Sequence, residues 1–330
     1  MPNLIQKFTQ AKSKSSFIVR YLAHKLDVDL TYDVNAPEDD PHSFQRHLLQ
    51  GPHVLASDVI ALRDNAGKHW VTHVSDMIIG QAMRLTGDYD GDAVSGVMGL
   101  FDTLGLPRPS GTFYDIGANI GTHTVQAHTM GFARSVSVEP DPMNFDLLAA
   151  NLALQGIHSN AETIHGALSD KVGVMKLERS NDNYGDHRVV SEDTPQVDRM
   201  DSDAGRTEIE VEVRTFDDVI AQSAAPLDAT ALVWMDVQGH EGHVFKGAQR
   251  ILDSGCPVVT EFWPYGLARA NGLDLFMDAV NQFSRIISIR DSADGVAVEM
   301  TAEDLVTLYH DRLGAEDRGG HIHADILLIK

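Results

Sequence analysis

Short apolar runs alternate with longer amphipathic segments from residue 111 to the end of the chain. The runs are rich in β-branched residues and predict strands, whereas the segments have apolar positions three or four apart and predict helices. Strands are expected at 112–116, 135–138, 163–167, 231–237, 257–261, 285–289 and 324–329, and helices at 120–130, 142–154, 241–252, 273–283 and 302–309. This alternation indicates an α/β fold with a doubly wound, mostly parallel sheet of seven strands.

The first part of the chain has a different pattern. Helical periodicity occurs only in HVSDMIIGQAMRL, with Ser75 or Asp76 as a cap, and in DAVSGVMGLFDTLGL. Residues 27–42 are acidic and contain prolines, which is typical of a linker or an exposed loop. Residues 1–26 carry five Lys and Arg residues and no acid, and suit a solvated helix or a frayed end, with a membrane-surface helix as the alternative. We therefore assign 1–84 to a helical or irregular N-terminal extension and 85–330 to the main domain.

Between the third and fourth predicted strands lies a longer interval. The runs VGVMKL and EIEVEVR predict two extra strands there, on either side of a polar insert at 180–206 that is rich in Asp, Ser and Asn. The insert is expected to lie outside the core, because so many polar groups are costly to bury.

Charge and cysteine content narrow the functional classes. Lys and Arg total 26 and Asp and Glu total 48, which gives a net charge of −22 and argues against a nucleic-acid partner or an anionic membrane. No apolar run approaches the roughly 18 residues that a transmembrane helix needs. A single cysteine, Cys256, excludes an internal disulfide and suits a reducing compartment, so we expect a cytoplasmic location.

The segment TFYDIGANIGTHT places a glycine turn directly after the first predicted strand. In open α/β sheets ligands bind at this end of the strands, where glycines let the backbone approach them. Gly117 and Gly121 fit that role, and Asn119 tolerates a left-handed conformation. Taken alone, the turn is equally consistent with tight packing.

An acidic residue at the end of the next predicted strand supports the interpretation of the turn as a ligand-binding site. Glu139 ends the second predicted strand, where a carboxylate accepts hydrogen bonds from ribose hydroxyls. The turn lacks the G-x-G-x-x-G spacing of dinucleotide enzymes, and Asp115 suits a cation better than a pyrophosphate. S-adenosylmethionine (SAM), which carries an ammonium and a sulfonium group, is therefore favoured over NAD.

Four motifs in order give the sequence a resemblance to the FkbM family of SAM-dependent methyltransferases. They are DIGANIG, EPDPMNFDLLAANLALQG, GALSDKVG and MDVQGHEGHVFKGA, and NDNYGDHRV and GGHIHADILLIK are similar to further family segments. The resemblance covers roughly residues 85–330. It implies that SAM binds at the ends of the first four predicted strands. The residues implied to bind SAM are Asp115, Gly117, Ala118, Asn119, Gly121, Glu139, Pro140, Ala167 and Asp236.

Methyl transfer to a hydroxyl needs a group that promotes loss of its proton. The candidates are Asp236, Glu261, Glu241 and His240, with Asp236 ranked first because it ends an apolar strand. A helix cap is the alternative for Asp236, and a favourable interaction with the helix dipole is the alternative for Glu241. The sequence leaves open whether Asp236 and Glu261 also hold a divalent cation.

Other features give weaker indications. His240 and His243 are three apart, not four as zinc-binding H-E-x-x-H requires. Tyr89 and Asp90, in GDYDGDAV, resemble a segment that closes over SAM in relatives, with a solvated loop as the alternative. His123 and the aromatic segment EFWPYG are expected either near the site or in the core.

We thus expect a SAM-dependent O-methyltransferase acting on a small molecule or glycan. Many relatives have a lysine and a glutamate where this chain has Trp234 and Gln238, so roles given to those side chains do not transfer. Two other functions stay open, a nicotinamide-dependent oxidoreductase and a SAM- or nucleotide-binding module without turnover.

Overall fold

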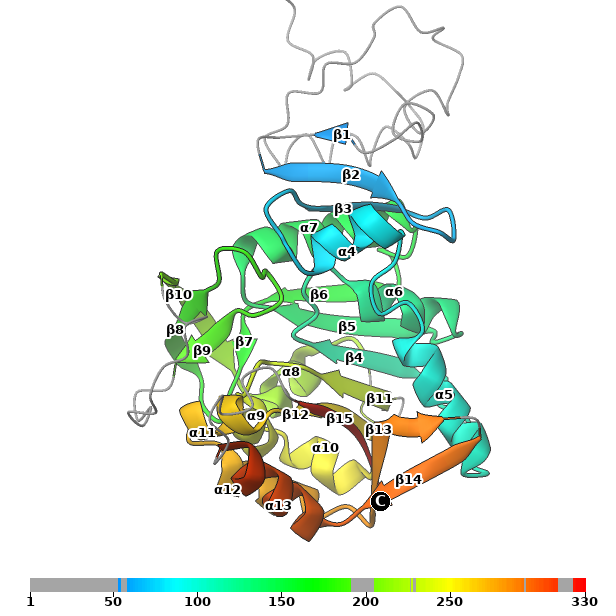
Figure 1. The fold of residues 1–330 in the computed structure, drawn as a ribbon, viewed down its shortest axis with the longest axis vertical. Coiled ribbons are helices and arrows are strands. Elements are labelled where there is room, and N and C mark those ends of the chain that lie inside the picture. The colour runs from blue at the N-terminus through cyan, green and yellow to red at the C-terminus, as the bar shows by residue number, and fades with distance from the viewer. Residues whose placement is uncertain are drawn as a thin grey trace, which may run out of the picture.

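The computed structural model describes residues 53–54, 58–190, 205–225, 227, 230–293, 295–313 and 323–330. Within these residues, helices cover a large central sheet, and a smaller sheet and a β-hairpin lie at its margins (Figure 1). The predicted basic segment at 1–26 and the acidic loop at 27–42 lie outside the described residues.

The central sheet confirms the doubly wound α/β class. Its strands are ordered β14-β13-β15-β12-β11-β4-β5-β6, and β12, β11, β4, β5 and β6 are parallel neighbours. It has eight strands where seven were expected, because the chain turns back after β13 and adds β14 as an antiparallel edge strand. The bounds are β4 Thr112–Ile116, β5 Arg134–Glu139, β6 Ala161–His165, β11 Thr230–Met235, β12 Val258–Phe262, β13 Arg285–Ala293, β14 Val296–Met300 and β15 Ala324–Ile329.

Side chains alternate between the two faces of this sheet and meet different helices. Phe113 of β4 packs with α5 (Ala93–Thr103) and α6 (Thr122–Thr129), whereas Tyr114 packs with α8 (Phe216–Gln222), α9 (Glu241–Lys246), α10 (Gln249–Ser254) and α12 (Leu273–Val280). Leu305 of α13 (Ala302–Leu313) joins the second cluster, and α7 (Pro142–Leu154) and α11 (Pro264–Arg269) are further helices of the main domain. Both faces of the central strands are therefore buried.

The helix predicted at 241–252 is divided into α9 and α10. A Cβ atom on Gly247 would lie 2.3 Å from the carbonyl oxygen of Ser169, so the chain passes too close to another segment for any larger residue here. The amphipathic pattern continues across the break, which is why periodicity alone predicted one helix.

The described part of the N-terminal extension is mainly a β-hairpin with a third, two-residue strand at its edge, which periodicity did not predict. It contains β1 (His53–Val54), β2 (Val59–Arg63) and β3 (His69–His73), followed by α4 (Ile79–Thr86), whose first turn is capped by the Asp76 carboxylate. The side chain of Asn151 in α7 bonds both backbone groups of Val71 and the carbonyl of Ile120. The hairpin thus shares a core with the main domain and is tied to its glycine turn.

A four-stranded sheet of β7 (Ala167–Leu168), β10 (Thr207–Arg214), β8 (Gly173–Arg179) and β9 (Arg188–Val190) holds part of the polar insert. The expectation that the insert lies outside the core is wrong for this part, because Arg188 is fully buried. Its guanidinium pairs with Asp186 and lies 4.8 Å from the centre of the Trp263 ring. Pairing with a carboxylate and an aromatic face is what makes burial of this charge tolerable.

Within the described residues, no helix is both long enough and apolar enough to cross a membrane.

Candidate active site

A cavity of about 520 Å³ opens at the carboxyl ends of β4, β5, β11 and β12. Such a volume suits a drug-sized ligand, and this edge of a parallel sheet is the usual position for one. Ten of the predicted site residues line this cavity: Tyr89, Gly117, Ala118, Asn119, Glu139, Pro140, Ala167, Asp236, His240 and Glu261. The remaining three, Asp115, Gly121 and Glu241, lie behind its wall.

The glycine turn is built from left-handed backbone. Gly117, Asn119 and Gly121 have φ angles of 85°, 49° and 91°, a region that glycine and asparagine tolerate best. At Gly117 a Cβ atom would also lie 1.9 Å from the carbonyl oxygen of Asp236. The first glycine is therefore required by close contact with the end of β11.

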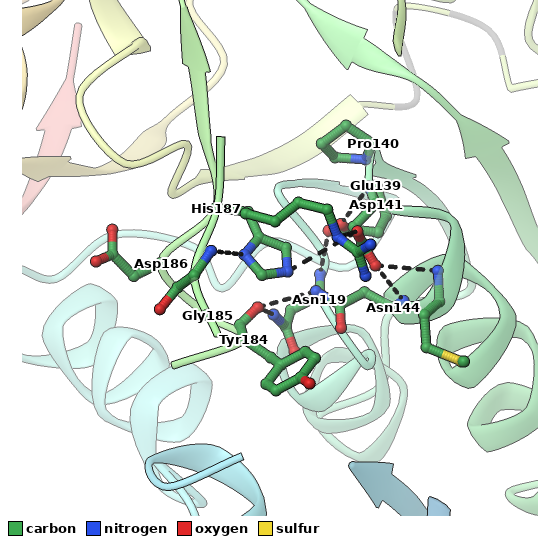
Figure 2. A network of polar contacts seen from close by, with 12 residues as sticks. Asn119, Glu139, Pro140, Asp141, Asn144, Tyr184, Gly185, Asp186 and His187 are labelled. Carbon is green, nitrogen blue, oxygen red and sulfur yellow. Dashed lines mark hydrogen bonds and ion pairs between the residues drawn. The ribbon is translucent and has the colours of Figure 1, made fainter. Parts of the chain in front are cut away.

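Glu139 joins the glycine turn to the start of α7. One carboxylate oxygen accepts from the backbone N–H of Asn119 at 2.9 Å, and the other accepts from that of Asp141 at 2.9 Å (Figure 2). Burial raises the pKa of this carboxyl to about 8, an effect that the two backbone hydrogen bonds only partly offset. A buried carboxylate at the cavity wall is thus held in one orientation.

Part of the cavity wall comes from the polar insert. None of the residues of this insert was predicted as a site residue. The carbonyl oxygen of Tyr184 accepts from the side-chain amides of Asn119 and Asn144 at 2.8 and 2.9 Å (Figure 2). His187 accepts at Nδ1 from the N–H of Ser180, 3.1 Å away. The similarity of NDNYGDHRV to a family segment was the only sequence signal for this wall.

Asp115 is buried beneath the glycine turn. One carboxylate oxygen accepts from the hydroxyl of Thr124, which is also hydrogen-bonded to Ser137, and the other oxygen has no partner in the described chain. Burial raises the pKa of Asp115. In the structure Asp115 therefore links α6 to β4 and β5 through the Thr124 hydroxyl.

Asp236 follows β11 and faces the cavity. Its carboxylate accepts from the side-chain amide of Gln238 at 2.7 Å, and Gln238 has a left-handed φ of 55°. Burial raises the pKa of Asp236, and the Gln238 hydrogen bond opposes that shift. Glu241 supports the same turn from below, since one of its oxygens accepts from the N–H groups of Val237 and Gly239.

Glu261 follows on the neighbouring strand β12 and is also directed to the cavity. Its exposed fraction is 7%, and one carboxylate oxygen has no partner in the described chain. The other oxygen lies 3.5 Å from Nδ1 of His323. Asp325 of β15 is directly opposite Glu261 in the sheet and also lines the cavity, so this end of the cavity is strongly acidic.

His240 and His243 stack on one another with ring centres 4.5 Å apart. Nε2 of His240 is 3.0 Å from the Ser169 hydroxyl, and Nε2 of His243 is 2.8 Å from the carbonyl of Ala270. Burial, and next the neighbouring His243, lower the pKa of His240 to about 3, so this ring is neutral at physiological pH.

The model of the methyltransferase FkbM domain matches residues 115–289, which is more than half of the chain and includes the carboxyl ends of β4, β5, β11 and β12. The chain belongs to the FkbM methyltransferase family.

Two curated relatives accompany this FkbM match. Methyltransferase sdnD of Sordaria araneosa is 28% identical over 214 residues, which are 55% of this chain and 83% of that protein. Ribosomal protein L11 methyltransferase of Pelotomaculum thermopropionicum is 35% identical over 65 residues, 20% of this chain. The chain therefore spans about a fifth, 21%, of the length of that relative.

Solved structures with weaker similarity include an O-methyltransferase from Bacillus cereus in complex with S-adenosylhomocysteine (SAH), with 10% identity and a TM-score of 0.39 over 76% of this chain and 87% of that one. An RNA methyltransferase from Salinibacter ruber, also with SAH, has 14% identity and a TM-score of 0.29 over 53% of this chain and 76% of that one.

Trp234 of β11, which lines the cavity, takes part in an aromatic contact. Its ring lies 4.4 Å from that of His123, and His123 is also 3.0 Å from the Asp90 carboxylate. Burial alone would lower the pKa of His123, but the hydrogen bond to Asp90 and the nearby carboxylates raise it overall. Tyr89, Asp90 and His123 all line the cavity.

Proposed function

We propose that this protein transfers the methyl group of SAM to a hydroxyl group on a small molecule or glycan. The observation that carries the proposal is the continuity of the cavity, which is lined at one end by Glu139 and at the other by Asp236 and Glu261. One end offers a carboxylate for ribose hydroxyls, and the other offers carboxylates to an acceptor.

The cofactor end supports SAM through its hydrogen-bonding groups. The Glu139 carboxylate is fixed by two N–H groups and retains lone pairs for the two ribose hydroxyls. Ala167 and Leu168 line the cavity nearby and are suited to the adenine ring, while the Gly117 turn allows the methionine part to approach the backbone. Membership in the FkbM family supports the same cofactor.

At the acceptor end the reaction is an in-line displacement. The acceptor oxygen bonds to the methyl carbon, the carbon–sulfur bond breaks, and the sulfonium becomes the neutral thioether of SAH. The hydroxyl must lose its proton, and Asp236 and Glu261 are the groups that promote this loss. Positioning by the cavity supplies the rest of the rate enhancement.

Calorimetric titration tests the cofactor. We expect SAM and SAH to bind the full chain with a stoichiometry of one, and NAD not to bind. Binding of NAD without SAM would overturn the proposal in favour of the oxidoreductase alternative. If SAM binds, incubation of enzyme and SAM with cell extracts should yield a product heavier by one CH₂ group, and absence of any such product would favour a binding module.

Glu139→Gln should change the pH dependence of SAH binding. Because the pKa of Glu139 is about 8 without ligand, the ionised form that accepts ribose hydrogen bonds increases as the pH rises. We expect the affinity of the natural chain for SAH to increase from about pH 6.5 to about pH 9, by up to about tenfold per pH unit below the pKa, and that of the variant to change less. Calorimetry at several pH values measures both.

The same substitution should change the pH dependence of the stability of the ligand-free protein. The folded-state pKa of Glu139 exceeds the unfolded value, so the folded chain binds the extra proton between those two values. The contribution of this carboxyl to the free energy of unfolding therefore falls as the pH rises through the window. The Tm of Glu139→Gln relative to that of the natural chain should therefore rise between about pH 6.5 and about pH 8.5, and its SAH binding should be weaker; equal pH profiles of SAH affinity in the two proteins would contradict the ribose assignment.

We also propose a cytoplasmic location. Cys256 is buried, and burial raises the pKa of its thiol to about 12, so this side chain is inert toward disulfide exchange. A chain whose single cysteine is not needed for a disulfide bond suits a reducing compartment.

A further inference from the structure

Three carboxylates from different elements converge at the end of the cavity that Asp236 and Glu261 line, with Glu241 behind its wall. Asp236 follows β11, Glu241 begins α9 and Glu261 lies in β12, yet each offers an oxygen within 4.8 Å of an oxygen of each of the others. Three negative charges this close repel one another strongly in a buried site. The arrangement therefore requires compensation.

The side chains of this cluster are incompletely satisfied by the protein. Glu241 is fully buried and Glu261 is 7% exposed, and each has one carboxylate oxygen without a hydrogen-bond partner in the described chain. None of the described lysines or arginines forms an ion pair with Asp236, Glu241 or Glu261; His323 lies 3.5 Å from Glu261, and His123 and His323 oppose the rise in the pKa of Asp236. Buried carboxylate oxygens without partners indicate that a ligand belongs there.

We propose that Asp236, Glu241 and Glu261 bind one divalent cation that prefers oxygen ligands. Oxygens bound to a single Ca²⁺ lie at most about 5 Å apart, and those bound to Mg²⁺ about 4 Å, so the cluster already has the spacing of a calcium-sized site and needs only small side-chain shifts for a smaller ion. Carboxylates are the ligands such ions select. The cation offsets two of the three charges.

The location of this cation site specifies one step of the reaction and to that extent rests on the proposed function. A hydroxyl oxygen that binds the cation has a lowered pKa and loses its proton to solvent water, after which it bonds to the methyl carbon while the carbon–sulfur bond breaks. The carboxylates would then promote deprotonation by holding the cation, rather than by accepting the proton themselves.

The test uses the full chain freed of metal by a chelator. Titration with Mn²⁺, followed by electron paramagnetic resonance and calorimetry without SAM, should give one bound ion per chain, displaced by Ca²⁺ or Mg²⁺. Glu261→Gln should weaken Mn²⁺ binding at least about tenfold, because it removes one charged ligand. Glu303→Gln, which removes an exposed carboxylate from α13, is the matched control and should bind Mn²⁺ like the natural chain.

The outcomes separate this proposal from the function. No saturable Mn²⁺ binding to the natural chain, or equal binding by Glu261→Gln, would overturn the cation site, and SAH binding by the same metal-free sample would leave the methyltransferase proposal intact. If Glu261→Gln weakens SAH binding and leaves Mn²⁺ binding unchanged, the cluster holds the ammonium of the cofactor and not a metal. Stoichiometric Mn²⁺ binding without SAH binding would instead remove the proposed function.

Discussion

Asp236→Asn is expected to lower kcat by about 10²-fold to 10⁴-fold while the Kd for SAH stays within about twofold. The amide keeps the size of the side chain but neither accepts a proton nor binds a cation well. The Gln238 amide, which donates to the carboxylate at 2.7 Å, can still donate to the asparagine oxygen, so the turn should persist. Single-turnover assays with SAM measure the chemical step, and calorimetry measures SAH binding.

The control for this variant is Asp92→Asn. Asp92 is exposed, its side chain makes no cap hydrogen bond at the start of α5, and it does not line the cavity. Its replacement changes the net charge equally and should leave the transfer rate unchanged. A transfer rate in Asp236→Asn equal to that of the control would remove Asp236 from the mechanism, whereas a large loss of SAH affinity would make it primarily a cofactor ligand.

Gly117→Ala is expected to have the largest effect on folding and on cofactor binding together. The added Cβ would lie 1.9 Å from the carbonyl oxygen of Asp236, and the φ angle of 85° is itself strained for alanine. The strain costs about 1–3 kcal/mol and the forced displacement of backbone about 1–3 kcal/mol more. Because the displaced segments carry both Asn119 and Asp236, SAH affinity should fall with the Tm.

Gly131→Ala separates these two contributions. Gly131 has a similar φ angle of 100°, but no atom lies within 4 Å of the position that a Cβ would take. This variant should lose only the free energy of backbone strain and should bind SAH normally. Thermal melts and calorimetry on both variants provide the comparison, and equal losses of Tm and SAH affinity in the two proteins would show that contact with Asp236 is unimportant.

The regular elements around the site could be predicted from local pattern. The strand Thr112–Ile116 and the helix Pro142–Leu154 have the predicted bounds, because an apolar run before a glycine turn and a proline after an aspartate cap are local signals. The left-handed conformation of Asn119 was likewise predictable from its residue type. Such features depend on neighbours in the sequence.

The acceptor end of the site could not be predicted in the same way. The sequence offered Asp236, Glu241 and Glu261 as candidates for the base and left open a cation between Asp236 and Glu261, but nothing local indicates that Glu241 joins that pair or that Asp325 lies opposite Glu261 across the sheet. The buried Arg188 is a similar case, since only its tertiary partners make its burial tolerable. A polar pattern alone predicts exposure.

The sequence by itself thus determined the fold class, the glycine turn and the acid that follows it, since each depends on periodicity, backbone freedom or residue type over a few positions. Tertiary structure alone decided which carboxylates share the cavity. It placed Asp115 behind the wall and Tyr184 in contact with Asn119. The physical reason is that distances between strand ends, and the burial that makes a carboxylate costly, are set by how the sheet and its helices pack.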